Sequence, residues 1–243
     1  MIDIHCHLLP ALDDGPREVE ESLAMARGLA ALGYREIVAT PHIPWGLDVW
    51  SVGEVASRTE ALAHGLSAAG IPVRLHHAAE HHACMALELI SQDRLLCYPR
   101  GDTFLLEFPL LGPPPPLDQI LFLCRIKKKV PVIAHAERYP DIQRDPSRVE
   151  DLLAQGASVL VNLTSLIRGG ERRIEKTAEQ LLRKGLASAV TTDMHSAEEV
   201  VLVEEALSLL PGLAGEDARE RLLVEGPARI IHGSPGAGKE AGP

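Results

Sequence analysis

The chain has 243 residues, of which 46% are hydrophobic and only 3% aromatic, and its formal net charge is −10. This length fits one large domain, whose core must be built mainly from aliphatic side chains. The negative charge argues against a nucleic acid or an anionic membrane as the main partner, but it allows an anionic substrate that is held by bound cations.

The four cysteines are irregularly spaced and include no Cys-x-x-Cys pair. In a chain of this length they indicate reduced thiols in a cytoplasmic protein. The N-terminus shows no basic segment followed by an apolar one, so we expect no signal peptide. No apolar run approaches the roughly 18 residues that a membrane span needs, so we expect no membrane insertion. The sequence carries no signature of a particular oligomeric state.

Short apolar segments alternate with longer segments of helical periodicity along the chain. We predict strands at residues 2–7, 36–40, 73–79, 103–108, 130–134, 157–163 and 187–192. We predict helices at residues 16–32, 52–69, 117–128, 147–155, 174–184 and 197–210, and a solvated surface helix at residues 216–223. This alternation indicates a parallel sheet with right-handed crossovers. Seven strands favour a closed or nearly closed α/β barrel, and an open doubly wound sheet is the competing arrangement.

Side chains that can bind a metal occur at or just beyond the ends of most of these strands. They are His5, His7, Asp14, His42, Glu80, Glu107, His135, Asp193 and His195. Because parallel α/β barrels gather the C-terminal ends of their strands around one mouth, these side chains can converge on one polynuclear cluster. Nitrogen and oxygen ligands without a thiolate favour Mn, Fe or Zn. The sequence therefore predicts a metalloenzyme.

Several of these residues also have plainer interpretations. His5 and His7 share one face of a strand, but an isolated pair of this kind is as often two buried, hydrogen-bonded histidines. Asp14 supports the metal interpretation, although Asp13 could be the ligand instead or cap the following helix. Asp193 and His195 share a face only if the chain stays extended.

Two pairs of histidines flank Glu80, at residues 76–77 and 81–82. We expect them to be polar residues around the barrel mouth rather than metal ligands. Arg168, beside two glycines in the loop after the sixth predicted strand, could contact substrate, but we favour a simple turn at this position.

The motifs that contain the nine residues resemble those of a known family. MIDIHCHLLP at residues 1–10 and DDG at residues 13–15 resemble the opening of the PHP (polymerase and histidinol phosphatase) superfamily. More narrowly, TPH (40–42), LEFP (106–109), AHAERY (134–139) and DMH (193–195) occur in the same order as in bacterial metal-dependent protein-tyrosine phosphatases of the CpsB/CapC/YwqE type. The resemblance covers residues 1–232 as one domain, and we expect the Gly- and Pro-rich residues 233–243 to be a disordered tail.

The resemblance implies a distorted (β/α)7 barrel with three divalent ions at its mouth, Mn being favoured over Fe or Zn. Transferred to this chain, the first ion is held by His5, His7, Glu80 and Asp193. Glu80 bridges to a second ion with Glu107 and His135, and the third is held by Asp14, His42 and His195.

Three positions bear on the choice of subfamily. Glu107 favours the tyrosine phosphatases, because similar histidinol phosphatases tend to carry histidine there. The chain departs from the family in having Gly226 before Pro227, where asparagine is usual, and TDMH at residues 192–195, where SDAH is common. Neither departure removes a ligand.

The resemblance further implies hydrolysis of phosphotyrosine by a metal-activated hydroxide, with three side chains expected to assist the reaction. Arg138 is expected to grip the phosphate, with a surface salt bridge as its plainer interpretation, and His42 or Asp193 to assist proton transfer. The implied partner is a bacterial tyrosine autokinase that regulates capsular or extracellular polysaccharide synthesis.

Other chemistries are less compatible with the sequence. The alternative is a small-molecule phosphomonoesterase such as a histidinol phosphatase, and a catalytically inactive metal-binding protein is disfavoured by the complete ligand set. A cysteine-dependent phosphatase would need an arginine six residues after its nucleophile. The residues in those positions are Leu12, Ile90, Thr103 and Val130.

Overall fold

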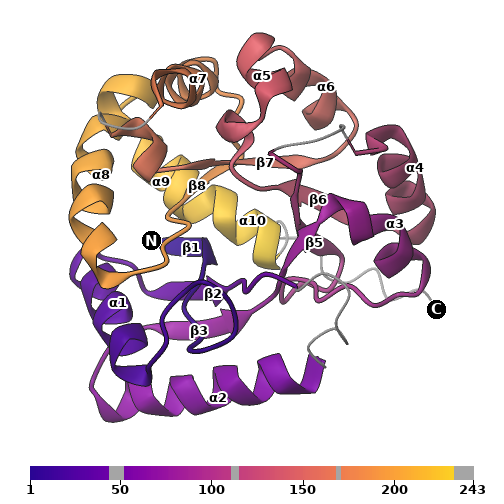
Figure 1. Cartoon of the computed structure of the whole chain (residues 1–243). Coiled ribbons are helices and arrows are strands. Elements are labelled where there is room, and N and C mark those ends of the chain that lie inside the picture. Colours follow the sequence, from indigo (N-terminus) through magenta and orange to yellow (C-terminus); the bar gives the residue numbers. More distant parts are fainter. Residues whose placement is uncertain (44–51, 111–114, 168–170, 233–243) are drawn as a thin grey trace, which may run out of the picture.

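The computed structural model describes residues 1–43, 52–110, 115–167 and 171–232. Its paired strands are all parallel, and helices surround them (Figure 1). The α/β fold with parallel strands that the sequence predicted is therefore confirmed. None of the helices in these ranges is long and apolar enough to cross a membrane.

The strands form two sheets. The first contains β1 (Ile2–Cys6), β2 (Glu36–Ala39) and β3 (Arg74–His77), in this order. The second contains β4 (Glu80–His82), β5 (Thr103–Glu107), β6 (Val130–Ile133), β7 (Ser158–Asn162) and β8 (Ala189–Thr191). The strand predicted at residues 73–79 is β3, and a further strand that was not predicted, β4, begins at Glu80.

Two isolated bridges join the sheets, one between Cys6 and Met194 and one between His42 and Glu80. Beside the first bridge, the His7 N–H donates to the Met194 carbonyl (3.0 Å) and the Asp193 N–H to the His5 carbonyl (2.8 Å). The chain after β8 therefore lies next to β1, as in a barrel and unlike an open doubly wound sheet. Within the described ranges, continuous strand pairing does not close the barrel.

Helices follow most of the strands. The longer ones are α1 (Val19–Ala31), α2 (Val52–Ala68), α3 (Ala83–Ser91), α4 (Leu117–Lys127), α6 (Arg148–Ala154), α7 (Arg172–Arg183) and α8 (Val200–Ala214). Shorter segments are η1 (Ala136–Arg138), α5 (Pro140–Arg144), η2 (Thr164–Leu166), η3 (Ala197–Glu199), α9 (Ala218–Glu220), η4 (Arg221–Glu225) and α10 (Gly226–His232). Helices α3, α5 and α10 were not predicted from the sequence.

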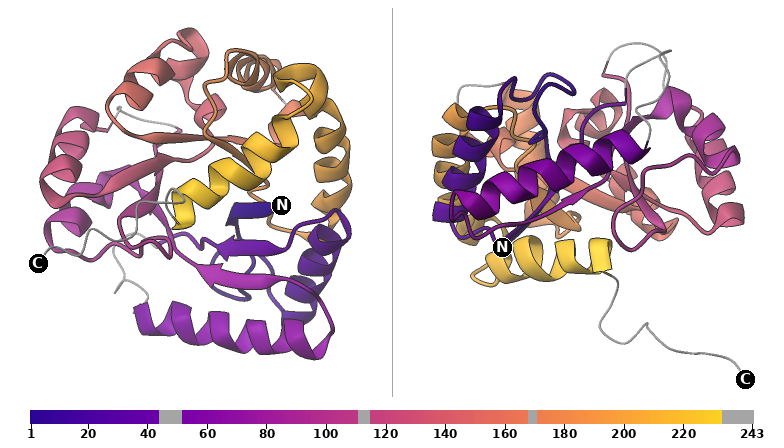
Figure 2. Two further views of the ribbon diagram at one scale, coloured as in Figure 1. Left: turned by 180° about the vertical axis from the view of Figure 1, so that it is seen from behind. Right: turned by 90° about the horizontal axis from the view of Figure 1, so that it is seen from below.

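An aliphatic core fills the inside of the barrel. It includes residues from successive strand positions, among them Ile4, Val38, Leu105, Val132, Leu160 and Ala189. Helix α10 adds Ile230 and Ile231 to this cluster and lies across the strands (Figure 2). Because Thr103, the first residue of β5, donates its hydroxyl to the Ile230 carbonyl (2.8 Å), α10 covers the N-terminal ends of the strands. The C-terminal ends remain free for a site.

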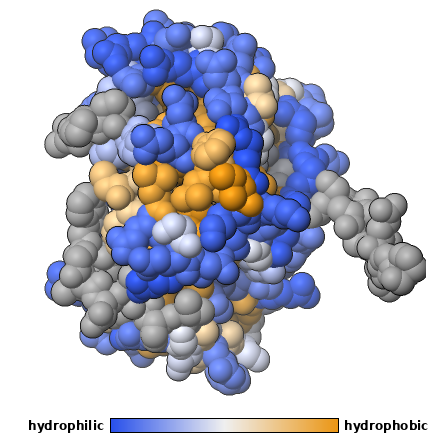
Figure 3. All heavy atoms as spheres, turned by 90° about the vertical axis from the view of Figure 1, so that its right-hand side faces the viewer, coloured by the Kyte–Doolittle hydropathy of each residue, from blue (hydrophilic) through white to orange (hydrophobic). Residues whose placement is uncertain are grey.

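The segment before α10 also differs from expectation. The predicted surface helix at residues 216–223 corresponds to α9 and part of η4, in which Ala218, Leu222 and Leu223 are buried. Elsewhere on the surface, apolar side chains gather on the side of α3 and α4 (Figure 3). Phe122 and Ile126 of α4 are 58% and 59% exposed and lie one helical turn apart.

Candidate metal centre

Seven of the nine candidate ligands lie at the C-terminal ends of strands or just beyond them, whereas Glu80 is the first residue of β4 and Asp14 lies in the loop between β1 and α1. His5 is in β1 and His7 follows it, whereas Glu107 is the last residue of β5. His42 and His135 follow β2 and β6, and Asp193 and His195 follow β8. This placement results from the parallel order of the strands, which brings distant parts of the sequence to one rim.

Glu80 lies at the centre of the cluster and is 1% exposed. Its Oε2 atom lies 3.2 Å from His5 Nε2, 3.4 Å from His7 Nε2 and 3.1 Å from His42 Nδ1. Its Oε1 atom accepts a hydrogen bond of 3.1 Å from His135 Nε2. Burial alone would raise the pKa of Glu80, but the imidazoles of His5, His135 and His7 together lower it well below its usual range. The carboxyl group is therefore an anion.

Three groups of side chains each direct their ligand atoms to one point, all within 4.8 Å of one another. One group is His5, His7, Glu80 and Asp193; the others are His7, Asp14, His42 and His195, and His42, Glu80 and Glu107. His135 lies beside the last of these, with Nε2 3.7 Å from Glu107 Oε1. The structure thus brings all nine predicted residues together, with His7 and His42 each near two groups.

The donor atoms fit divalent transition-metal ions. Ligand atoms at about 2.1 Å from a common ion lie roughly 3–4 Å from one another, which is the spacing found around Glu80. Glu80 Oε2 is buried and forms no hydrogen bond, although three imidazoles surround it. A buried carboxylate oxygen without a donor is costly unless a cation compensates it.

Two of the candidate ligands have unusual backbone angles. His135 has φ of 27° and Asp193 has φ of 50°, in a region that residues with a Cβ rarely adopt. The extended conformation therefore does not continue from Asp193 to His195, contrary to the condition stated from the sequence. Both side chains still reach the cluster, because Asp193 Oδ1 lies 3.2 Å from His5 Nε2 and the His195 ring stacks on His7 at 4.0 Å.

Comparison with known proteins places this chain in a family. Residues 1–232 match the family model described as "Capsular polysaccharide synthesis, CpsB/CapC". The chain belongs to the CpsB/CapC family. It is 30% identical to the tyrosine-protein phosphatase YwqE of Bacillus subtilis over 228 residues, which are 90% of each chain. It is 26% identical to the tyrosine-protein phosphatase CpsB of Streptococcus pneumoniae, over 95% of this chain and 98% of that protein.

Solved structures agree with this assignment. One match comes from the crystal structures of YwqE from Bacillus subtilis and CpsB from Streptococcus pneumoniae, described as "unique metal-dependent tyrosine phosphatases". Its TM-score is 0.86 at 28% identity, and the match covers 96% of this chain and 95% of that one. A lactonase from Listeria monocytogenes shares the fold at a TM-score of 0.62 and 13% identity, over 95% and 94% of the two chains. The chain thus has the fold of the metal-dependent tyrosine phosphatases YwqE and CpsB, and the lactonase shares that fold.

Arg138 ends η1, three residues after His135. Its Nη1 atom lies 3.5 Å from Asp193 Oδ2, and its side chain is 37% exposed. The guanidinium therefore reaches the edge of the cluster while remaining open to solvent. Arg168, the other arginine considered from the sequence, lies outside the described residues.

Asp13 orients His7 rather than joining the ligand groups. Its Oδ2 atom accepts a hydrogen bond of 2.7 Å from His7 Nδ1 and another from the backbone N–H of His42 (3.0 Å). Burial would raise the pKa of Asp13, but the bond to His7 lowers it. Helix α1 begins at Val19, so Asp13 does not cap it. A carboxylate behind a histidine ligand fixes its tautomer, which directs Nε2 to the cluster.

Asn162 was missed by the sequence analysis. It ends β7, and its Nδ2 donates a hydrogen bond of 2.7 Å to Asp193 Oδ2, while its Oδ1 accepts from the Thr191 hydroxyl (3.2 Å). The rule that revealed the other residues could have found it, because β7 is a predicted strand whose end received no candidate. An amide is a weak metal ligand, so a search for metal-binding side chains does not select Asn162.

The sequence analysis placed all four histidines that flank Glu80 around the barrel mouth, and for two of them this was wrong. His81 is completely buried; its Nδ1 donates to the Leu105 carbonyl (3.0 Å) and its Nε2 accepts from the Leu96 N–H (3.1 Å). Burial lowers the pKa of His81 to about 4, so it is neutral. His76 points to the opposite end of the barrel, where its Nε2 lies 2.8 Å from Glu36 Oε1.

Proposed function

We propose that this CpsB/CapC chain is a metal-dependent protein-tyrosine phosphatase. The observation that carries the proposal is the convergence of imidazoles on the buried Glu80 carboxylate, in a family whose named relatives are tyrosine-protein phosphatases. Phosphate ester hydrolysis needs an activated water and compensation of the phosphoryl charge. Bound divalent ions would supply both, by acidifying water and neutralising the phosphoryl oxygens.

The proposed ligands of three ions follow the three groups of side chains. His5, His7, Glu80 and Asp193 would hold one ion, and Glu80, Glu107 and His135 a second. Asp14, His42 and His195 would hold the third. We propose Mn as the metal, with Fe or Zn compatible with the same nitrogen and oxygen donors.

Arg138 would bind the phosphoryl group of the substrate. Its guanidinium can donate two parallel hydrogen bonds to phosphate oxygens, and its exposed position on the rim leaves it accessible. The present contact with Asp193 Oδ2 would keep the side chain directed to the cluster before substrate binds. Phosphate binding at Arg138 would thereby direct the phosphorus toward the proposed metal ligands around Glu80.

His42 and Asp193 are the candidates for proton transfer to the leaving oxygen. The His42 side chain is 35% exposed, whereas Asp193 is 8% exposed and accepts a hydrogen bond from Asn162. As a proposed metal ligand, His42 would donate from the ring nitrogen that does not hold the ion, and its exposure would let an incoming tyrosyl oxygen approach that nitrogen. The Asp193 carboxylate, held in place by the bond from Asn162, would serve mainly as a metal ligand.

The proposed substrate is a phosphotyrosyl protein, and the proposed partner is a bacterial tyrosine kinase of polysaccharide synthesis. The family description supports this choice, as does Glu107 at a position where similar histidinol phosphatases tend to have histidine. The cytoplasmic location expected from the reduced cysteines belongs to the same proposal.

The test compares turnover of three substrates by the Mn-loaded protein: a phosphotyrosyl peptide, the matching phosphoseryl peptide and histidinol phosphate. We expect the highest kcat/KM for the phosphotyrosyl peptide. A preference for histidinol phosphate would make the chain a small-molecule phosphatase, and no turnover of any phosphate ester by the metal-loaded protein would refute the proposal.

A further inference from the structure

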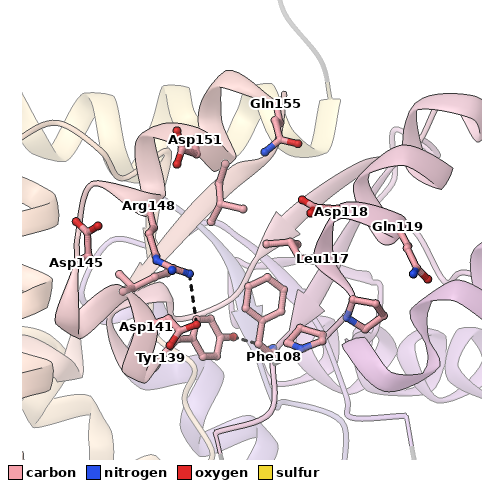
Figure 4. A pocket seen from close by; sticks show the side chains of 14 residues that line it. Phe108, Leu117, Asp118, Gln119, Tyr139, Asp141, Asp145, Arg148, Asp151 and Gln155 are labelled. Carbon is pink, nitrogen blue, oxygen red and sulfur yellow. Dashed lines mark hydrogen bonds and ion pairs between the residues drawn. The ribbon is translucent and has the colours of Figure 1, made fainter. Parts of the chain in front are cut away.

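A groove lies between α4, α5 and α6, beside the proposed active site (Figure 4). Its cavity volume is about 820 Å³, which is within the range of protein ligand sites and large enough for several side chains. The apolar part of its wall includes Phe108, Leu117, Tyr139, Ile142 and Leu152, together with two prolines.

Two buried aromatic residues lie between the groove and the metal centre. Phe108 directly follows Glu107, and Tyr139 directly follows Arg138. The two rings lie 4.9 Å apart, the Phe108 N–H donates to the Tyr139 hydroxyl (3.0 Å), and the Tyr139 ring lies 5.5 Å from that of His135. The same pair also lines an adjoining cavity of about 250 Å³. One wall of the groove therefore backs directly onto the cluster.

The rim of the groove carries carboxylates that the described residues leave uncompensated. Asp141 is paired with Arg144 and Arg148. Asp118, at the start of α4, and Asp151, in α6, have no ion pair or side-chain hydrogen bond within the described ranges, and both are exposed. An apolar wall with two free negative charges complements a ligand that combines apolar and cationic groups.

We propose that this groove binds the polypeptide next to the phosphotyrosine and prefers a segment that carries lysine or arginine. The inference rests on the proposed function, since the phosphotyrosine would occupy the neighbouring cluster. Tyr139 belongs to the groove wall and its ring lies 5.5 Å from that of His135, a distance that an extended chain covers in about two residues at about 3.3 Å per residue. The carboxylates of Asp118 and Asp151 disfavour a second anionic group in the groove.

The experiment uses the full-length, Mn-loaded protein and three phosphotyrosyl peptides: one flanked by alanines, one with two lysines on the N-terminal side and one with two lysines on the C-terminal side. The value of kcat/KM for p-nitrophenyl phosphate, which has no flanking chain, normalises each series. We expect one lysine peptide to exceed the alanine peptide by about threefold to tenfold, mainly through KM, and the difference to shrink at high salt.

The variant Asp118→Asn/Asp151→Asn removes both charges at nearly constant volume, and Glu150→Gln, an exposed α6 residue outside the groove, is the matched control. The lysine preference should disappear in the first variant and persist in the second. Equal turnover of all three peptides by the wild-type protein would overturn the proposal that the groove selects a cationic segment. A lysine preference that survives the double substitution would overturn it as well. Failure to hydrolyse p-nitrophenyl phosphate and every peptide would instead overturn the proposed function itself.

Discussion

Glu80 combines two properties that are rarely found together. Its carboxylate is buried, yet its Oε2 atom forms no hydrogen bond although three imidazole nitrogens lie within 3.4 Å. Around it, Asp13 directs His7 and Asn162 directs Asp193. The residues behind the ligands therefore determine where the ligand atoms point, as is usual in metal centres.

Arg138→Ala separates substrate binding from metal binding. We expect this variant to retain its metals and its Tm but to lose about 1.5–3 kcal/mol of charge-assisted hydrogen bonding to phosphate. That loss corresponds to about a tenfold to 150-fold decrease in kcat/KM. Arg138→Lys should recover only part of it, because an ammonium group lacks the planar fork of guanidinium. Wild-type kcat/KM on a phosphotyrosyl peptide for the alanine variant would show that another residue binds the phosphate.

Asn162→Ala removes the hydrogen-bond donor to Asp193 Oδ2 but replaces none of the proposed metal ligands. We expect metal affinity to decrease by about tenfold to 100-fold, because Asp193 loses its fixed orientation. Calorimetric titration of the metal-free protein with Mn²⁺ measures this directly and does not depend on turnover. Thr177→Ala, which removes a buried hydroxyl from α7 that bonds only to the Arg173 carbonyl of the same helix, is the control. Equal affinities for both variants would exclude a positioning role for Asn162.

Most element boundaries follow from local patterns, and the exceptions have tertiary causes. The third predicted strand ends at His77, where its pairing with β2 stops, and the unpredicted β4 begins three residues later and pairs with β5. Pro41, which has no N–H, stands just beyond the end of β2 and cannot donate to a continuing ladder. Helix α10 was missed because it is short and begins with Gly226 and Pro227, a pattern more typical of a turn. Its Ile230 and Ile231 are stabilised by the barrel interior.

His81 links β4 to β5 and to the chain after α3 through its two ring nitrogens. Its folded-state pKa of about 4 lies below the usual 6.5, so the unfolded chain binds the proton more readily. Its contribution to stability is complete above about pH 6.5 and decreases as the pH falls toward 4, by up to about 3 kcal/mol.

The variant His81→Leu lacks this titration and leaves two backbone groups unsatisfied. We expect it to be less stable than the wild type by about 2–4 kcal/mol at pH 7.5, and the difference to narrow at pH 4.5. Urea unfolding of the metal-free proteins at both pH values measures the two differences. A difference that does not change with pH would contradict a buried, neutral His81.

Gly226 allows α10 to approach β8 closely. A Cβ at this position would lie 2.1 Å from the Ser188 carbonyl oxygen, so Gly226→Ala requires the backbone to shift and should cost about 1–3 kcal/mol. Gly212→Ala in α8 is the matched control, because nothing lies within 4 Å of its added Cβ. It should be neutral or stabilise by up to about 1 kcal/mol. Equal Tm values for the two variants would show that the contact at Gly226 relaxes without cost.

At the scale of the whole molecule, the sequence predicted the composition of the cluster better than its connections. The positions of His5, Glu107 and His135 at strand ends were sufficient to predict convergence, because parallel topology alone gathers those ends. The bonds from Asn162 to Asp193 and from Asp13 to His7 depend on side-chain directions across neighbouring segments. The incomplete closure of the barrel likewise depends on the pairing of β1 with the chain after β8, which no local pattern specifies.

The most direct test of the central claim is the rate of phosphate release from a phosphotyrosyl peptide by chelator-treated protein, measured during titration with Mn²⁺. The nine converging side chains predict no turnover without metal. They also predict that the rate of phosphate release rises with added Mn²⁺ and levels off at about three equivalents of Mn²⁺ per chain. Full turnover by protein shown to be free of metal would contradict the account.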